Sequence, residues 1–373
     1  MAQDPHLFLA AVSLPLGVAT GAVLHRSDIC FAAVFRDLFL FRRADMLRIL
    51  VLLVTATALL FELARLAGLL PLYPFPLLYA PTAANVVGGA LFGVGMVLAG
   101  GCVVGTLVRV GAGSLASLAA LAGLFAGSGL YGEIHLPWKA FIGATTFLPG
   151  RTTLPQALGV APTVPVLAAV LAGGILVARW ARAGRLRRDS PAAGHLQPWK
   201  AALLLSVASL LSYVLVGLPM GITTSYAKVA GWLEGLVAPA HVAASAFFGG
   251  VPLDAVHPVT GLPMRGGPGP RLDAIAAIQF PLAAGIVLGA ALSARLVGEL
   301  RVHLRVPPRQ LAWAFAGGAV MGLASRMAPT CNIWHLLGGL PILSLSSILF
   351  LAGLLPGAWL GGRMLTAWVV RTR

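Results

Sequence analysis

Charged residues are scarce in this chain of 373 residues. Asp, Glu, Lys and Arg together make up 10% of the sequence, whereas a soluble domain carries roughly 25%. Hydrophobic residues make up 58%, and the mean hydropathy is +0.91. Because so few charges cannot cover a water-facing surface, the composition excludes an ordinary soluble protein and indicates an integral membrane protein.

Acidic residues are especially few, which leaves a net charge of +15. In a soluble protein such an excess would suggest binding to nucleic acid. In a protein that crosses the membrane several times, Lys and Arg instead gather in cytoplasmic loops. The sequence has no nucleic-acid-binding motif, so we expect membrane lipid around the chain and no nucleic-acid partner.

Cysteine is also rare, and the three that occur are Cys30, Cys102 and Cys331. None belongs to a CxxC pair, which argues against a disulfide framework and against a structural zinc site. The first apolar run has no basic residue before it, so it is interpreted as a retained span rather than a cleaved signal peptide. We expect a protein that is not an enzyme and has neither cofactor nor metal.

Long apolar runs predict an all-α membrane protein with about nine transmembrane helices, since one span needs about 20 apolar residues. The expected spans are residues 7–24, 47–70, 83–100, 114–131, 160–180, 201–218, 274–297, 312–327 and 345–370. Clusters of arginine follow the first, fifth, seventh and ninth spans, at 36–48, 179–188, 295–309 and 371–373. The positive-inside rule makes that side cytoplasmic. We therefore predict a multi-pass protein of the bacterial inner membrane, with its N-terminus outside and its C-terminus in the cytoplasm.

An internal repeat relates the third span to the eighth and the fourth span to the ninth. Six residues match six others at a constant offset: Gly88, Gly89, Ala90, Gly93, Ala99 and Cys102 with Gly317, Gly318, Ala319, Gly322, Ala328 and Cys331. The stretch from Ser114 then matches the stretch from Ser344 at ten of nineteen positions. An offset of five spans is odd, so the two halves cross the membrane in opposite directions. We predict a single transmembrane domain over 1–373, with inverted halves at about 1–158 and 199–373 and a linking span and basic loop at about 159–198.

Each cysteine precedes a segment that is not expected to continue a straight span. Pro329, for example, disfavours helix at Ala328. Non-helical backbone at membrane depth is tolerated where it is buried in protein or lines a polar cavity. We therefore expect re-entrant or broken helices that bring Cys30 and Cys102 from the cytoplasmic side and Cys331 from the outside. Ser225 is a weak counterpart of Cys30 in the second half.

The residue types around the cysteines favour a soft anion. Thiols are polarisable, weak hydrogen-bond donors, and arginine in a spanning region usually faces a cavity or a partner. Basic residues lie near the cysteines and Ser225: Arg26, Arg36, Arg109, Arg326 and Lys228. A substrate that is an anion and carries exposed sulfur fits both features.

Three other interpretations stay open at this point. A buried free cysteine is most often a small hydrophobic residue, and glycines such as Gly88 serve close helix packing. A membrane thiol oxidoreductase would call for a vicinal dithiol, and a soft-metal transporter would call for clustered Cys, Met and His. The Cys331–His335 spacing suits a pair of metal ligands, although it is a single weak pair.

Three motifs, "HRSDICFAAVFRD", "GVGMVLAGGCVVGTLVRVGAG" and "SRMAPTCNI", resemble the cysteine motifs of the YeeE/YedE family of sulfur-transport membrane proteins. The resemblance covers nearly the whole chain. It implies an hourglass-shaped inverted-repeat fold with Cys30, Cys102 and Cys331 at its narrow centre. It also implies uptake of thiosulfate, or of a selenium species in some members, by transfer between thiols.

The same resemblance implies a small cytosolic sulfur-carrier protein as a partner. Our candidate substrate-binding residues are Cys30, Cys102, Cys331, Arg109, Arg326, Ser225, Gly101 and Asn332. The loop at 251–271 has no counterpart that can be matched to the family pattern.

Overall fold

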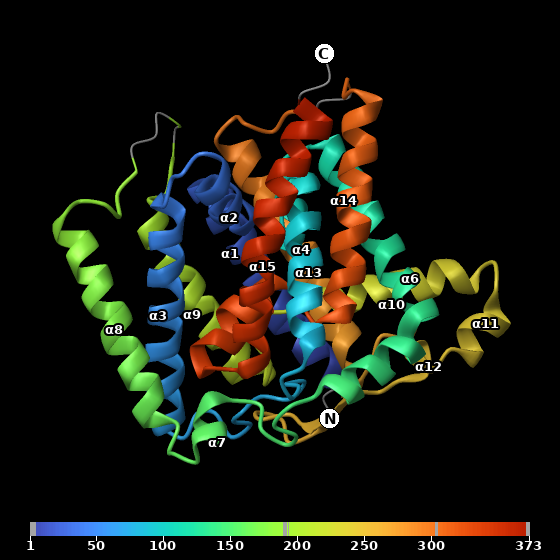
Figure 1. Ribbon diagram of the computed structural model, residues 1–373, viewed down its shortest axis with the longest axis horizontal. Helices are drawn as coiled ribbons and strands as arrows, with labels where there is room; N and C mark the ends of the chain where they lie inside the picture. Colours follow the sequence, from blue (N-terminus) through green and yellow to red (C-terminus); the bar gives the residue numbers. More distant parts are fainter. Residues whose placement is uncertain (1–4, 189–191, 193, 303–304, 371–373) are drawn as a thin grey trace.

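The computed structural model describes residues 5–188, 192, 194–302 and 305–370. Within these residues the protein is mostly helical, and most of its long helices run side by side in one bundle (Figure 1). The long helices are α1 (Pro5–Ser27), α3 (Asp45–Leu66), α4 (Ala83–Leu98), α6 (Leu115–Thr145), α8 (Thr163–Arg182), α9 (Pro198–Val216), α13 (Ala274–Leu296), α14 (Pro308–Met327) and α15 (Leu345–Met364).

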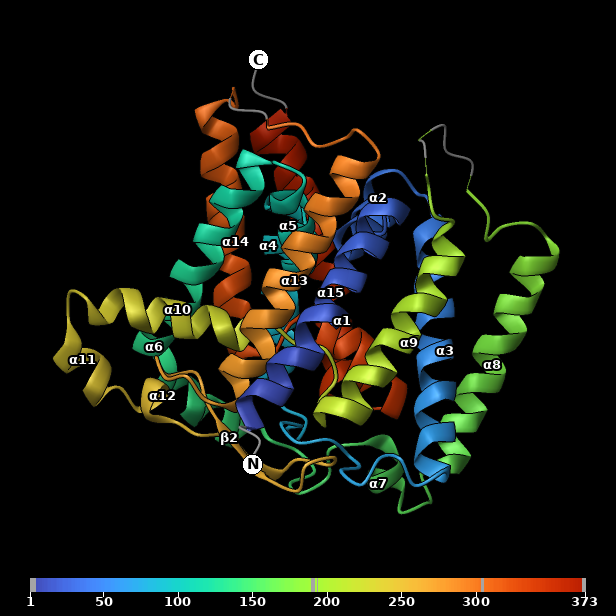
Figure 2. The same ribbon diagram turned by 180° about the vertical axis from the view of Figure 1, so that it is seen from behind.

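Short elements lie between and across these helices. They are α2 (Phe31–Leu40), α5 (Val103–Gly111), α7 (Leu154–Leu158), α10 (Thr223–Gly235), α11 (Pro239–Ala244), α12 (Ala246–Gly249), the single turns η1 (Trp334–Gly339), η2 (Leu340–Ile342) and η3 (Leu365–Val370), and the strands β1 (Leu253–Val256) and β2 (Pro263–Gly266). Helix α10 lies across the direction of the long helices, as both views show (Figure 2).

Eight helical stretches in the described part of the chain are long and apolar enough to cross a membrane. They confirm a multi-pass membrane protein and correspond to eight of the nine expected spans. The remaining span, expected at 312–327, lies in α14. This helix forms as expected, but it is less apolar than the other eight and carries Arg309 and Arg326 near its ends.

The two ends of the bundle differ in charge. The chain begins at one end, here called the N-terminal side, and finishes at the opposite end, the C-terminal side (Figure 1). The connections from α2 to α3, from α8 to α9 and from α13 to α14 all lie on the C-terminal side (Figures 1 and 2). Three of the four predicted arginine clusters therefore gather at one end, as expected. The fourth, Arg371 and Arg373, lies outside the described residues.

Glycines let four long helices pack in two pairs with their backbones in contact. Helix α6 packs against α14, and α15 packs against α4. A Cβ added at any of four glycines would collide with a backbone carbonyl oxygen of the partner helix: Gly123 with Phe315, Gly127 with Ala319, Gly353 with Val86 and Gly357 with Ala90. Helices α4 and α14 also cross each other, where Gly95 faces Gly317. These contacts fix the positions of the segments that follow α4 and α14, which carry Cys102 and Cys331.

The chain breaks before each cysteine, as predicted from the sequence. One residue at each break has a positive φ: Asp28 at 52°, Gly100 at 74° and Thr330 at 94°. A positive φ ends a right-handed helix, in which φ is about −63°. The chain then continues as α2, α5 or η1.

The loop at 251–271 forms an antiparallel hairpin of β1 and β2 on the N-terminal side. Buried Lys228 of α10 anchors its return segment. The Lys228 Nζ atom donates to the carbonyl oxygens of Gly269 and Arg271 at 2.9 Å each and pairs with Asp273 Oδ2 at 2.7 Å. The expectation that Lys228 attracts an anion is therefore wrong, because Asp273 neutralises its charge.

The glycine contacts generate a stability prediction. Gly127→Ala should lower the melting temperature of the detergent-solubilised protein, because overpacking costs about 1–3 kcal/mol. Gly357→Ala should act in the same way. Gly174→Ala on α8 is the matched control: no atom lies within 4 Å of its added Cβ, and alanine is favoured over glycine in a helix by about 1 kcal/mol. Equal melting temperatures for Gly127→Ala and Gly174→Ala would contradict this account of the helix pairs.

Candidate functional site

Cys30 and Cys102 meet at the centre of the bundle. Cys102 is fully buried and precedes α5, where its sulfur accepts the backbone N–H of Gly105 at 3.4 Å. A Cβ added at Gly105 would lie 3.5 Å from the sulfur of Cys102 and 3.5 Å from that of Cys30. Because both sulfurs lie beside the same position, the two thiols are neighbours. The structure thus brings together two of the three predicted cysteines, and all three are free thiols.

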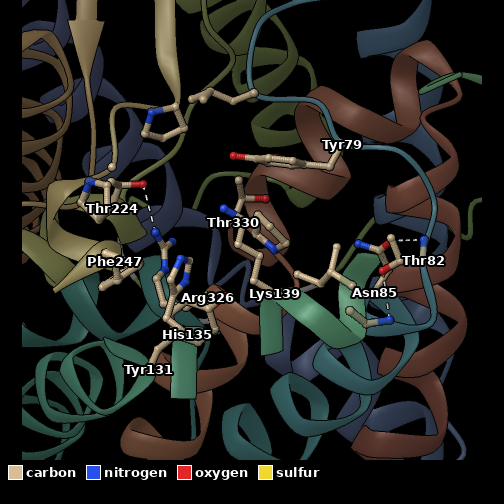
Figure 3. Close-up of a pocket in the computed structure, with 18 of the residues that line it drawn as sticks. Tyr79, Thr82, Asn85, Tyr131, His135, Lys139, Thr224, Phe247, Arg326 and Thr330 are labelled. Carbon is tan, nitrogen blue, oxygen red and sulfur yellow. Dashed lines mark hydrogen bonds between the residues drawn. The ribbon is translucent and has the colours of Figure 1, made fainter. Parts of the chain in front are cut away.

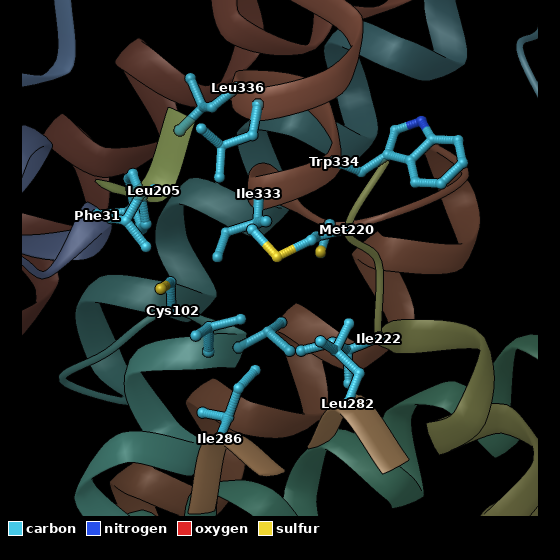
Figure 4. Packing of buried hydrophobic residues seen from close by; sticks show 14 of the residues in the cluster. Phe31, Cys102, Leu205, Met220, Ile222, Leu282, Ile286, Ile333, Trp334 and Leu336 are labelled. Atoms are coloured by element: carbon cyan, nitrogen blue, oxygen red, sulfur yellow. The ribbon is translucent and has the colours of Figure 1, made fainter. Parts of the chain in front are cut away.

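Cys331 belongs to the same buried cluster but approaches it from the other half of the chain. It is fully buried in the break after α14, and its thiol interacts with the backbone at Ile222 and Ile333. Cys102 faces apolar side chains from several elements, among them Ile222 and Ile333 (Figure 4). The next residue, Asn332, lies beside the Cys102 thiol. Cys102 and Cys331 are therefore buried in one mostly apolar cluster at the centre.

Arg109 lies beside the Cys30–Cys102 pair. Its Nη2 atom is 4.0 Å from the Cys30 sulfur, and its Nη1 atom donates to the carbonyl oxygen of Gly100. Gly101 lies beside this guanidinium, since a Cβ there would be in ordinary contact with Nη1, at 3.4 Å. Arg109 and Gly101 are thus placed together next to the thiols, as the sequence motif suggested.

Ser225 lies at the start of α10. Its hydroxyl donates to the carbonyl oxygen of Ile222 at 2.6 Å, and its backbone N–H donates to Gln279 Oε1 at 2.8 Å. These bonds shape the turn that begins α10. In this structure Ser225 supports the turn beside Cys331, and its hydroxyl is already engaged.

A cavity of about 570 Å³ opens on the N-terminal side and is lined by Arg326 and Thr330, the residue before Cys331. Other polar lining residues are Tyr79, Thr82, Asn85, Tyr131, His135, Lys139 and Thr224 (Figure 3). Neither Asp nor Glu appears among the lining residues of the described chain. Val251, Pro252 and Pro268 of the hairpin segment also line the cavity. The cavity is therefore basic, and the unmatched loop forms part of its wall.

Arg326 is held in this cavity by hydroxyl groups. Its guanidinium donates to Thr223 Oγ1 and, at 3.2 Å, to Thr224 Oγ1. Its side chain is mostly buried, and none of the ion pairs found among the described residues involves it. Arg326 and Thr330, the residue before Cys331, line the same cavity. A largely desolvated cation without an ion-pair partner attracts an anion strongly.

Sequence reasoning missed several residues of the site. Tyr79 and Lys139 line the cavity from distant parts of the chain, and no local motif marks them. Tyr226 is buried near the thiols of Cys102 and Cys331. It directly follows Ser225 in the sequence.

Comparisons with known proteins agree with this chemistry. Residues 26–360 match the family described as sulphur transport. The thiosulfate transporter TsuA of Spirochaeta thermophila is 30% identical over 371 residues, which cover 93% of this chain and 97% of that protein. The probable transporter YedE of Salmonella typhimurium is 37% identical over a stretch that covers 29% of this chain and 25% of YedE. The thiosulfate transporter TsuA of Escherichia coli is 35% identical over a stretch that covers 28% of this chain and 29% of that protein. The structure is a bundle of helices able to span a membrane, with buried thiols and a basic cavity, and the family match covers most of the chain. This chain therefore belongs to the sulphur transport family.

Proposed function

We propose that this protein takes up thiosulfate across the bacterial inner membrane by passing the ion between Cys331, Cys102 and Cys30. The observation that carries the proposal is the pairing of the Cys30 and Cys102 thiols in a dry centre that connects, through Cys331, to a basic cavity. A thiol can pair with the terminal sulfur of thiosulfate by a weak hydrogen bond. The ion crosses chemically unchanged, so the protein acts as a transporter and not as an enzyme.

The direction of transport follows from the proposed topology. The arginine clusters gather on the C-terminal side, and the positive-inside rule makes that side cytoplasmic. The cavity with Arg326 then opens to the outside, and the N-terminus is outside as well. An entering anion meets Arg326 first, then Cys331, and then the Cys102–Cys30 pair beside Arg109.

The membrane potential opposes this uptake by about 2.3 kcal/mol per charge per 100 mV. A coupled ion or rapid consumption in the cytoplasm must offset that cost. A small sulfur-carrier protein that receives the ion on the C-terminal side would provide such consumption.

An inverted repeat with an hourglass shape accounts for the packing of the helices. In the proposed repeat, α1, α3, α4 and α6 correspond to α9, α13, α14 and α15, and α8 is the linking span. The observed partners obey this relation: α1 packs on α13 as α9 packs on α3, and α4 packs on α15 as α14 packs on α6. The colliding glycines obey it too, with Gly127 on α6 matching Gly357 on α15. Equivalent breaks then place Cys102 and Cys331 on opposite sides of one central constriction.

Replacement of Arg326 tests the entry step. Arg326→Ala should raise KM for thiosulfate uptake in proteoliposomes about tenfold to hundredfold, because a hydrogen bond to a charged group contributes about 1.5–3 kcal/mol. Arg326→Lys keeps the charge and should lie between this variant and wild type. The control is Arg265→Ala on β2, where an exposed arginine pairs with Asp254 at 3.0 Å on the same side. An unchanged KM in folded Arg326→Ala would remove Arg326 from the pathway.

Replacement of the central thiol tests the transfer itself. Cys102→Ala and Cys102→Ser should both abolish or nearly abolish uptake per folded molecule, since a hydroxyl is harder and less polarisable than a thiol. Cys30→Ser and Cys331→Ser should be damaging but milder. The measurement is uptake of labelled thiosulfate, normalised to monodisperse, membrane-inserted protein. If Cys102→Ser transports at nearly the wild-type rate, the thiols serve packing alone and transfer between them is rejected.

A further inference from the structure

Two buried polar side chains at the centre of the bundle lack a nitrogen or oxygen hydrogen-bond partner among the described residues. Asn332 is fully buried, and no nitrogen or oxygen atom pairs with its amide, which lies against the weakly hydrogen-bonding thiol of Cys102. Tyr226 is 3% exposed, and its hydroxyl is also unpartnered. Buried polar groups in native proteins are nearly always paired, so each exception calls for an explanation. A ligand that hydrogen-bonds both groups is one such explanation.

Both groups belong to the second half of the chain and lie near the buried thiols. Asn332 directly follows Cys331 and lies beside the Cys102 thiol. Tyr226 lies on α10, in the same buried cluster as Cys102 and Cys331. Its ring is fixed by an edge-on contact with Phe125 of α6, with ring centroids 5.2 Å apart. Both side chains are therefore located in the region through which an ion would pass between Cys331 and Cys102.

We propose that the Tyr226 hydroxyl and the Asn332 amide form a binding subsite for the oxygen atoms of a sulfur oxyanion, while its terminal sulfur faces the Cys102 thiol. This inference rests on the proposed transport of thiosulfate and adds the part of the protein that recognises the oxygen end of the ion. A tyrosine hydroxyl and an amide NH₂ are both hydrogen-bond donors, and the oxygens of the anion are acceptors.

The neutrality of these two donors suits a site that must also release its ion. Permeation requires binding that is favourable enough for entry and weak enough for exit. The cations stand on either side of the subsite: Arg326 lines the cavity, and Arg109 lies beside Cys30. The subsite favours an ion that has both oxygens and a terminal sulfur. Sulfate has no such sulfur, and hydrosulfide has no oxygens.

The test compares two buried tyrosines, each changed to phenylalanine. Tyr226→Phe removes an unpartnered hydroxyl. Tyr213→Phe is the matched control, because the Tyr213 hydroxyl is engaged with the carbonyl oxygen of Leu72 at 2.5 Å. Asn332→Leu, nearly isosteric and apolar, tests the second donor. For each variant, KM and maximal rate are measured with labelled thiosulfate in proteoliposomes, and the melting temperature is measured with and without thiosulfate.

Tyr226→Phe is expected to raise KM about tenfold and to reduce the thiosulfate-induced rise in melting temperature. Its melting temperature without ligand should equal or exceed that of wild type, because a buried unpaired group is lost. Tyr213→Phe should show the reverse pattern, with a lower melting temperature and an unchanged KM. Asn332→Leu should behave like Tyr226→Phe.

Three results would overturn the subsite. The first is an unchanged KM with an unchanged thiosulfate-induced shift in Tyr226→Phe, as expected if these groups bind only water. The second is a loss of uptake in Tyr226→Phe that is matched by a loss of stability in the absence of ligand. The third is unaltered thiosulfate binding in folded Asn332→Leu. None of these results depends on the outcome for the Cys102→Ser variant. If that variant transports normally, transfer between thiols is rejected instead.

Discussion

Backbone at membrane depth must find its hydrogen-bond partners inside the protein, and this constraint shapes the centre of the structure. Every cysteine lies where a helix stops and a short element starts. The stop exposes backbone groups that only the opposite half of the protein can enclose. The close glycine contacts of α4 with α15 and of α6 with α14 provide that enclosure. The soft chemistry of the thiols is possible because the surrounding helices exclude water.

Features set by local composition could be predicted from the sequence. The apolar runs gave eight of the helices that are able to cross a membrane, and Pro329 marked the break before Cys331. The three arginine clusters in the described part of the chain lie on one side, as the positive-inside rule predicts for short loops. The matched glycines could be identified because the same steric need recurs in both halves of the chain.

Features that depend on distant contacts could not be predicted. Lys228 seemed free to attract an anion, but Asp273, 45 residues further along the chain, balances its charge. Tyr226 and Lys139 belong to the site because of where α10 and α6 lie, and nothing in their neighbouring residues signals this. The strands β1 and β2 are only four residues each, and the part that their segment plays in the cavity wall appears only in three dimensions.

The glycine contacts also limit which parts of the protein can move. A shift by one residue along the α6–α14 or α4–α15 interface would drive a side chain into a backbone oxygen, so each pair behaves as one rigid body. Sliding of one helix along its partner would break these contacts, whereas movement of a whole pair would leave them intact. A conformational change that keeps these interfaces must therefore carry α6 with α14 and α4 with α15 as units.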